Sequence, residues 1–324
     1  MSNAVIVLRL NAMGDVLLTV PVLRALAAGG KEVHLVIKKC WKPLADFLPA
    51  IVHTYDGASS LVSLAGRLKK LNPESLYDLQ GKLSTVALRA LIKAPETKVY
   101  SKRTLGEQFM AIRHQYPLRF TDTRPVWQKY AEVCGVDCST PDASLNFTEE
   151  YIQECQRLLA TNGLKEKDFI FIHPEASKPG KAMTSELVMA IQKASPVKTA
   201  IIGTGKEIYT CSAPHVDLRN RFELHYLPGI MSLAKAVISS DSGPMHLARA
   251  VNVPLVGIFF QTDPCLGFSP IPSAKTLVIS ECLACKPCSL HGQNKTCPEK
   301  HFKCRQINVA EVVSRTFEFL KDKI

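Results

Sequence analysis

Short apolar runs that alternate with helical patterns constrain the fold of this chain most. Runs such as Ala4–Leu10 (AVIVLRL) and Lys31–Lys38 (KEVHLVIK) are typical of buried strands. Strands that alternate with helices predict a parallel sheet with right-handed crossovers. In the first half we expect strands at 4–10, 31–38 and 75–80, and helices at 16–28, 61–71 and 84–92.

The same alternation restarts after Asp137–Asn146, a stretch rich in Ser, Thr, Pro and Asp that we take as a linker. Two successive units of comparable size predict an α/β protein with two facing Rossmann-like domains. We place these domains at residues 1–145 and 146–308, followed by a closing helix within 309–324. In the second domain we expect strands at 168–173, 198–203, 236–239 and 255–260, and helices at 149–162, 186–193 and 245–251.

Charge and hydropathy limit the class of protein. Lys and Arg outnumber Asp and Glu by 40 to 29, which favours anionic partners. A nucleic-acid-binding protein is not expected, because no helix-turn-helix or RNA-recognition signature is present. The longest apolar stretch, Val251–Phe260, is about half of the ~20 residues that a spanning helix needs. The first residues are too short for a signal peptide, so we expect a cytoplasmic protein.

A lone carboxylate follows the first expected strand. The loop Arg9–Asp15 carries a flexible Gly14 and ends on Asp15, at the carboxyl edge of the predicted sheet. Asp15 is a candidate general base, and a helix N-cap is the alternative. Pro21 would remove a hydrogen bond from a helix that starts at Asp15, so the first turn should be irregular or the helix should begin later.

A candidate anion site follows the strand expected at 236–239. Pro244 suits the first helical turn, with Asp241 or Ser242 as the cap. The exposed amides around Gly243 and the helix dipole would favour phosphate, and His246 could donate to phosphate or ribose. A capped structural helix with an incidental histidine is the alternative.

Two further loops follow strands of the second domain. Ser177 and Lys181 stand among Gly and Pro turns, an arrangement that suits a diphosphate. Glu207 could accept hydrogen bonds from ribose hydroxyls. A solvated surface loop is the alternative for both.

Five of the 11 cysteines fall in one short segment, which we call the cysteine loop (residues 282–304). Its Cys-x2-Cys spacing is typical of a structural metal site, in which zinc or iron binds four thiolates. Five thiols for four positions leave one surplus, either Cys282 or Cys288. Disulfides and free thiols are the alternatives. The candidate metal ligands are Cys282, Cys285, Cys288, Cys297 and Cys304.

These motifs, taken in this order, resemble glycosyltransferase family 9, the ADP-heptose:lipopolysaccharide heptosyltransferases. The segments that carry the resemblance are LRLNAMGDVLLTVPVLRAL, LYDLQGKLSTVALRALI and SSDSGPMHLARAVNVPLVGIFFQTDP. The resemblance implies the GT-B fold, with a deep cleft between its two domains and a C-terminal helix that packs back on the N-terminal domain. It also permits a metal in the cysteine loop, since some relatives carry an iron-binding finger there.

The resemblance implies an inverting transfer of a heptose from ADP-heptose to a lipopolysaccharide core acceptor. Another nucleotide-sugar, a protein acceptor, or an inactive nucleotide-sugar-binding homologue are the alternatives. Asp15 matches the catalytic base, and Lys181 would stabilise the leaving diphosphate. The chain departs from the family where Lys181-Ala182-Met183-Thr184 replaces Lys, an aromatic residue and Pro. The residues that match the donor site are Gly14, Ser177, Glu207, Asp241, Ser242, Gly243 and His246.

No Asp-x-Asp motif is present to hold a divalent ion, so we expect no cofactor for catalysis. The basic segment Lys93–Lys129 lies where the family binds its acceptor, and it would attract the anionic inner core. A solvated loop face is the alternative. An anionic glycolipid acceptor also implies peripheral contact with the inner membrane. The candidate acceptor residues are Lys102, Arg103 and Arg113.

Overall fold

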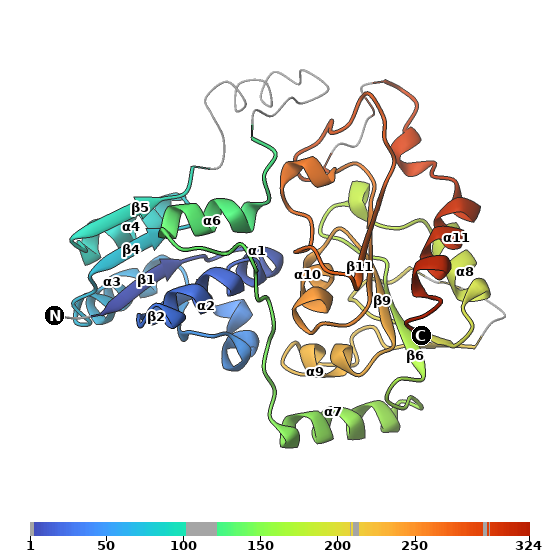
Figure 1. The fold of residues 1–324 in the computed structure, drawn as a ribbon, viewed down its shortest axis with the longest axis horizontal. Helices are drawn as coiled ribbons and strands as arrows, with labels where there is room; N and C mark the ends of the chain where they lie inside the picture. The colour runs from blue at the N-terminus through green and yellow to red at the C-terminus, as the bar shows by residue number, and fades with distance from the viewer. Residues whose placement is uncertain (1–2, 102–121, 208, 210–213, 294–296, 298) are drawn as a thin grey trace. The chain divides into compact units, whose positions relative to one another are not determined.

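The computed structural model describes residues 3–101, 122–207, 209, 214–293, 297 and 299–324. The chain divides into two compact units (Figure 1). Of the described residues, the first unit holds 3–101 and 124–146, and the second holds 122–123 and those from Phe147 onward. Among the described residues, no helix combines the length and the apolar character that crossing a bilayer requires.

The first unit is built on a parallel sheet of five strands in the order β3-β2-β1-β4-β5. β1 lies at the centre, and all five of its residues are buried, which explains its unbroken apolar sequence. Helices α3 and α4 pack on each other over a core that includes Leu64, Leu68 and Leu88. The elements are β1 (Ala4–Leu8), α1 (Met13–Leu17), α2 (Val20–Ala28), β2 (Glu32–Lys38), η1 (Lys39–Phe47), β3 (Ile51–Tyr55), α3 (Ala58–Lys69), β4 (Ser75–Asp78), α4 (Leu83–Ile92), β5 (Glu96–Val99) and α6 (Val126–Cys134).

The second unit is built on a parallel sheet of six strands in the order β11-β10-β9-β6-β7-β8. Its central strands β9, β6 and β10 are fully buried. The elements are α7 (Glu149–Thr161), β6 (Phe169–His173), η2 (Pro179–Lys181), α8 (Ser185–Ala194), β7 (Lys198–Ile201), β8 (His215–Asp217), α9 (Leu227–Ser232), β9 (Ala236–Ser240), α10 (Gly243–Ala250), β10 (Leu255–Phe259), η3 (Pro264–Leu266), β11 (Thr276–Ser280), η4 (Lys303–Arg305) and α11 (Val309–Leu320).

The C-terminal helix α11 packs against α8 of the second unit (Figure 1). Its residues Val312 and Leu320 are buried in the same apolar cluster as Leu187 and Ile191 of α8. The helix therefore contributes to the core of the second unit.

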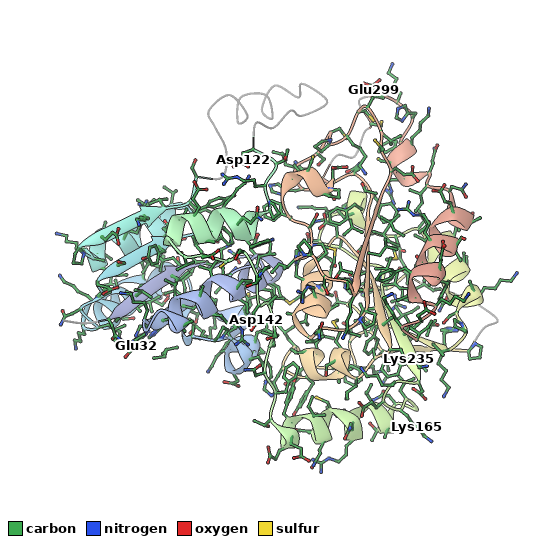
Figure 2. All side chains as sticks on the ribbon, viewed as in Figure 1. Glu32, Asp122, Asp142, Lys165, Lys235 and Glu299 are labelled. Carbon is green, nitrogen blue, oxygen red and sulfur yellow. The ribbon has the colours of Figure 1, made fainter. Side chains whose placement is uncertain are left out.

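The predicted linker has no regular structure and is fastened to the first unit. Arg24 on α2 pairs with Asp142, which Figure 2 labels, at 3.3 Å between Nε and Oδ2. Arg24 Nη2 also donates to the Ser144 carbonyl at 2.6 Å. These contacts hold the linker until the chain enters the second unit at Phe147.

The first predicted helix is broken, as Pro21 indicated. The short α1 ends at Leu17, and a new helix, α2, starts at Val20. Pro21 lies in the first turn of α2, where a backbone N–H has no hydrogen-bond acceptor within the helix, so proline disrupts no helical hydrogen bond there. The strands β3, β5, β8 and β11 were not predicted. They lie at or near the sheet edges and are partly or fully exposed, so their sequences lack a continuous apolar run.

Candidate functional site

Asp15 lies in the first turn of α1, directly after β1 at the carboxyl end of the first sheet. Its Oδ2 accepts a hydrogen bond from the Ala12 N–H at 2.9 Å. The same oxygen lies 2.5 Å from Nη2 of Arg9. The carboxylate thus supports the start of the helix, while about one fifth of its side chain stays exposed (19%).

Arg9 is a buried cation beneath this loop. It is only 1% exposed, its Nη1 donates to the Leu79 carbonyl, and its guanidinium lies 5.5 Å from the centre of the Tyr130 ring. Burial opposes the charge, but Tyr130 and Asp15 together raise the pKa of Arg9 above its ordinary value. A buried arginine without a nearby carboxylate would be costly, so Arg9 and Asp15 stabilise each other.

The loop after β4 completes this end of the first sheet. Asp78 Oδ1 accepts hydrogen bonds from the backbone N–H groups of Gln80 and Gly81, each with an N to O distance of 2.9 Å. Gln80 Oε1 in turn accepts the Asn11 N–H at 3.1 Å. Two neighbouring strand ends are therefore tied together around Asp15.

In the second unit, three loops meet at a lysine–aspartate pair. Lys181 Nζ, from the loop after β6, lies 2.9 Å from Oδ2 of Asp241, which follows β9. The hydroxyl of Thr262, after β10, donates to the same oxygen at 2.6 Å. The Asp241 side chain is 7% exposed and the Lys181 side chain 17%. Lys181 and Asp241, two of the candidate donor residues, are thus in contact at the carboxyl ends of the central strands.

Helix α10 begins beside this pair. Ser242 is its N-cap residue, but its hydroxyl does not cap the helix and lies 3.1 Å from Nδ1 of His173 instead. Burial lowers the pKa of His173 to about 4, so the imidazole is neutral at pH 7. Pro244 occupies the first turn, as predicted, and His246 is buried in that turn. Because the Ser242 hydroxyl does not cap α10, the backbone N–H groups at the start of this helix are suited to bind an anion.

Glu175 is a polar residue of this edge to which the sequence analysis assigned no role. Its Oε2 accepts the Thr204 N–H at 2.7 Å, and its Oε1 lies 3.9 Å from Nη1 of Arg219. A Cβ at either Gly203 or Gly205 would lie 2.5 Å from the carboxylate. The sequence Gly203-Thr204-Gly205 could have indicated this contact, because glycines on both sides of one residue allow another group to approach the backbone closely.

Two further predicted donor residues lie on the surface, whereas Gly14 is buried in α1. Ser177 is exposed in the loop before η2. Glu207 is also exposed and accepts from the Tyr209 hydroxyl at 3.3 Å. The candidate acceptor residues Lys102, Arg103 and Arg113 fall outside the described residues.

The cysteine loop brings several thiols near one another. Burial raises the pKa of Cys288 to about 11, and Cys304, Cys285 and Cys297 lie near enough to raise it further. Burial acts to raise the pKa of Cys297, but backbone N–H groups of residues 299–302 lower it below the ordinary value of a thiol. In the part of the chain that the structure describes, no three His, Cys, Asp or Glu side chains are arranged to hold a metal ion.

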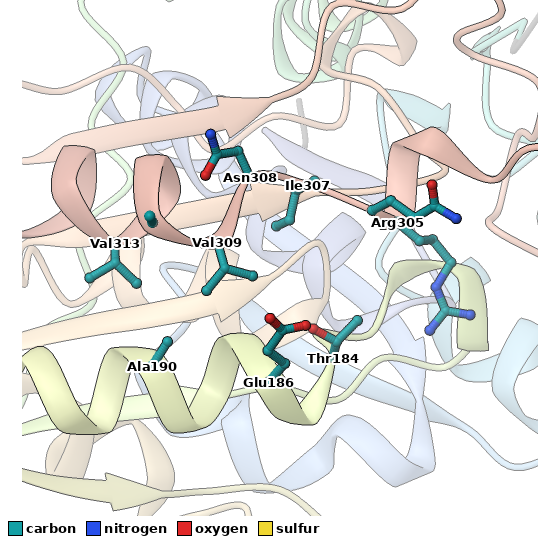
Figure 3. Close-up of a pocket in the computed structure, with 10 residues that line it drawn as sticks. Thr184, Glu186, Ala190, Arg305, Ile307, Asn308, Val309 and Val313 are labelled. Atoms are coloured by element: carbon teal, nitrogen blue, oxygen red, sulfur yellow. The ribbon is translucent and has the colours of Figure 1, made fainter.

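A groove of about 790 Å³ lies between the starts of α8 and α11 (Figure 3). Thr184 and Glu186 line one side, and Asn308, Val309 and Val313 line the other. Lys181 and Asp241 do not line this groove, so it is separate from the lysine–aspartate pair.

Comparisons with known proteins agree with the resemblance seen in the sequence. The model of glycosyltransferase family 9 (heptosyltransferase) matches residues 61–302. Lipopolysaccharide heptosyltransferase 3 of Escherichia coli (strain K12) is 21% identical over 277 residues, which cover 77% of this chain and 80% of that protein.

Two solved structures share the fold over nearly the whole chain. The E. coli ADP-heptose LPS heptosyltransferase II superposes with a TM-score of 0.73 at 16% identity, covering 98% of this chain and 99% of that one. The iron-containing dodecameric glycosyltransferase TibC from enterotoxigenic E. coli superposes with a TM-score of 0.62 at 14% identity, covering 98% and 76%. The fold is therefore GT-B-like, and the chain belongs to glycosyltransferase family 9 and is a glycosyltransferase.

Proposed function

We propose that this enzyme transfers a heptose from ADP-heptose to a lipopolysaccharide core acceptor, with inversion at the anomeric carbon. The observation that carries the proposal is the placement of Asp15, a partly exposed carboxylate fixed at the carboxyl end of the first sheet by Arg9 and the Ala12 N–H. The relatives named as lipopolysaccharide heptosyltransferases supply the sugar and acceptor class.

In this mechanism Asp15 removes the proton from the acceptor hydroxyl as that oxygen attacks the anomeric carbon. The new bond forms between the acceptor oxygen and the anomeric carbon, and the bond from that carbon to the diphosphate breaks. The donor leaves as ADP, and the proton stays on Asp15 until it passes to solvent.

The second unit would hold the donor diphosphate. Lys181 is positioned by its contact with Asp241, and the start of α10 lies next to Asp241 in the chain. As the leaving diphosphate gains negative charge, the Lys181 ammonium and the amides around Gly243 would stabilise it. The proposed donor ligands on the loops are Gly14, Ser177, Glu207, Ser242 and His246.

The basic segment that includes Lys102, Arg103 and Arg113 would recruit the acceptor. Carboxylates and phosphates on the inner core would be attracted by these cations. The reaction would take place in the cytoplasm, with the enzyme in peripheral contact with the inner membrane and without nucleic acid as a partner.

The cysteine loop would hold a structural zinc or iron ion, and that ion would take no part in the chemical step. Four thiolates suit either metal. Cys285 and Cys297 lie near enough to Cys288 and Cys304 to raise the pKa of both, which makes these four thiols the proposed ligands. Cys282 would be the surplus thiol. Metal analysis of protein purified without added metal should find about one ion per chain, since such sites bind tightly. Less than ~0.2 ion per chain, with every thiol titratable, would contradict this proposal.

A donor screen tests the proposed substrate. ADP-, GDP- and UDP-sugars are compared by the free energy that each adds to unfolding, and a ligand at 100 times its Kd should add about 2.7 kcal/mol. We expect ADP-heptose to stabilise the wild-type protein and to act much less on K181A. Stabilisation by a GDP- or UDP-sugar alone would refute the donor assignment. Binding of ADP-heptose without transfer to any core acceptor would identify an inactive binding homologue instead.

A further inference from the structure

The cysteine loop touches the loop that carries Lys181. The Gly180 N–H donates to the Gly292 carbonyl at 3.1 Å, while the Gly180 carbonyl accepts the Gln261 N–H at 3.0 Å. Gly180 is therefore held from two sides by backbone groups, one of which belongs to the cysteine loop.

Gly292 also lies against the Lys181 side chain itself. A Cβ at Gly292 would collide with Lys181 Cγ and would lie 3.0 Å from Lys181 Cδ. The residue has a φ of +69°, which L side chains rarely adopt. Both the space around residue 292 and its backbone conformation therefore require glycine. Because Gly292 lies against the aliphatic part of the Lys181 side chain, it limits the conformations that this side chain can adopt.

A buried serine builds the turn that presents Gly292. The Ser289 hydroxyl, on a residue that is 2% exposed, accepts the Gly292 N–H at 2.8 Å and the Gln293 N–H at 3.2 Å. Ser289 follows Cys288 directly, so the turn is continuous with the cluster of thiols.

The other end of the loop is fastened beside the partner of Lys181. The Lys286 side chain is 2% exposed, and its Nζ donates to Ser280 Oγ at 2.7 Å and lies 3.6 Å from Asp263 Oδ2. Asp263 follows Thr262, whose hydroxyl donates to Asp241. The cysteine loop therefore contacts both Gly180, which precedes Lys181, and Asp263, which follows the Thr262 that donates to Asp241.

We propose that the Ser289–Gly292 turn is a positioning element of the donor site, which holds the Lys181 stem so that its ammonium meets the leaving diphosphate. This inference rests on the proposed function, in which Lys181 binds that diphosphate. It gives the cysteine loop a role in donor binding beyond stabilising its own fold, with Gly292 and Ser289 as the residues that act through Lys181.

The substitution Gly292→Ala tests the contact, with Gly163→Ala as its matched control. Gly163 has a similar φ of +75° in the same unit, but a Cβ there would meet nothing within 4 Å. We expect G292A to raise the Kd for ADP, measured by titration calorimetry, about tenfold, as for partial loss of a charge-assisted hydrogen bond. G163A should leave the Kd unchanged. An equal effect of both variants would attribute the loss to backbone strain and overturn the inference.

A second variant, Ser289→Ala, keeps the test decisive if G292A does not fold. It removes the acceptor of two N–H groups without adding an atom, and it should also raise the Kd for ADP several-fold. In a K181M background neither G292A nor S289A should weaken binding further, because both act through Lys181. Additive losses in that background would refute a positioning role.

The same titrations separate this inference from the proposed function. If K181M leaves the Kd for ADP unchanged, Lys181 does not bind the diphosphate, and both proposals are wrong. If K181M weakens binding while G292A and S289A do not, only the positioning role is wrong.

Discussion

Breaking the buried Arg9–Asp15 pair should destabilise the first unit far more than breaking an exposed pair of the same length. Arg9 is almost fully buried, so Asp15→Asn leaves a guanidinium in the core without its counter-charge. Loss of one partner of a buried pair costs about 3–5 kcal/mol. Because the Asp15 side chain is 19% exposed, we expect about 3 kcal/mol for D15N, at the lower end of that range.

The double variant R9M/D15N removes both charges and should recover part of this loss, with a coupling free energy of about 2 kcal/mol. Lys39 and Asp56 provide the control pair, since they also lie 2.5 Å apart but their side chains are 62% and 55% exposed. The cycle K39M, D56N and K39M/D56N should give a coupling below about 1 kcal/mol.

Native-state hydrogen exchange of the β1 amides is the suitable assay, because it reports the opening of the first unit rather than of the whole chain. A coupling of 2 kcal/mol corresponds to a change of about 30-fold in the opening equilibrium. Equal couplings for the buried and the exposed pair would refute the reasoning that burial makes Arg9 depend on Asp15.

Three further predictions follow from the site. Burial lowers the pKa of His173 from 6.5 to about 4, so the folded state binds this proton less readily than the unfolded state. The stability due to neutral His173 is complete above pH 6.5 and is lost as the pH falls towards 4, by about 3 kcal/mol at most. Urea unfolding of wild type and H173Q should show a smaller acid-side loss in the variant, and identical pH profiles would contradict the shift. K181A should weaken ADP binding in calorimetry by about 10- to 100-fold, as expected for a lost charge-assisted hydrogen bond, and unchanged affinity would exclude Lys181 from the donor site. Charge reversal at Lys102, Arg103 and Arg113 should raise the KM for the acceptor and leave the KM for the donor unchanged in steady-state transfer assays, whereas equal effects on both would argue against an acceptor role.

The sequence predicted the helices and strands whose formation depends mainly on residues close together in the chain. The central strands and the helices after them carry unbroken apolar runs or helical spacing, and α11 was placed at the residues where it occurs. Edge strands such as β8 and β11 were missed, because partly exposed strands have no distinctive apolar pattern. Pro21 predicted an irregular first turn or a later start for the helix expected at 16–28, and the long helix of this segment does start later, at Val20.

Loop motifs after the strands singled out Asp241 and Lys181 as candidate donor residues, and the structure brings these two side chains into contact. Their role in donor binding stays a prediction. Residues that act through tertiary contacts were missed. Arg9 stands within a run expected to be a buried apolar strand, and its partners Leu79 and Tyr130 are distant in sequence. Thr262 and Gly292 likewise meet the pair only in the folded chain.

If Asp15 is the base of a heptosyl transfer, its substitution by asparagine should stop the transfer. Single-turnover transfer from ADP-heptose to a core acceptor is measured for wild type, D15N and D46N, in which an exposed aspartate of the same unit is changed. ADP titration with each protein confirms that the second unit is intact, and hydrogen exchange of the β1 amides confirms that the first unit of D15N stays folded under the assay conditions. We expect D15N to bind ADP like the wild type but not to transfer heptose, and D46N to transfer it. Transfer by D15N at the wild-type rate would contradict the assignment of Asp15 as the base.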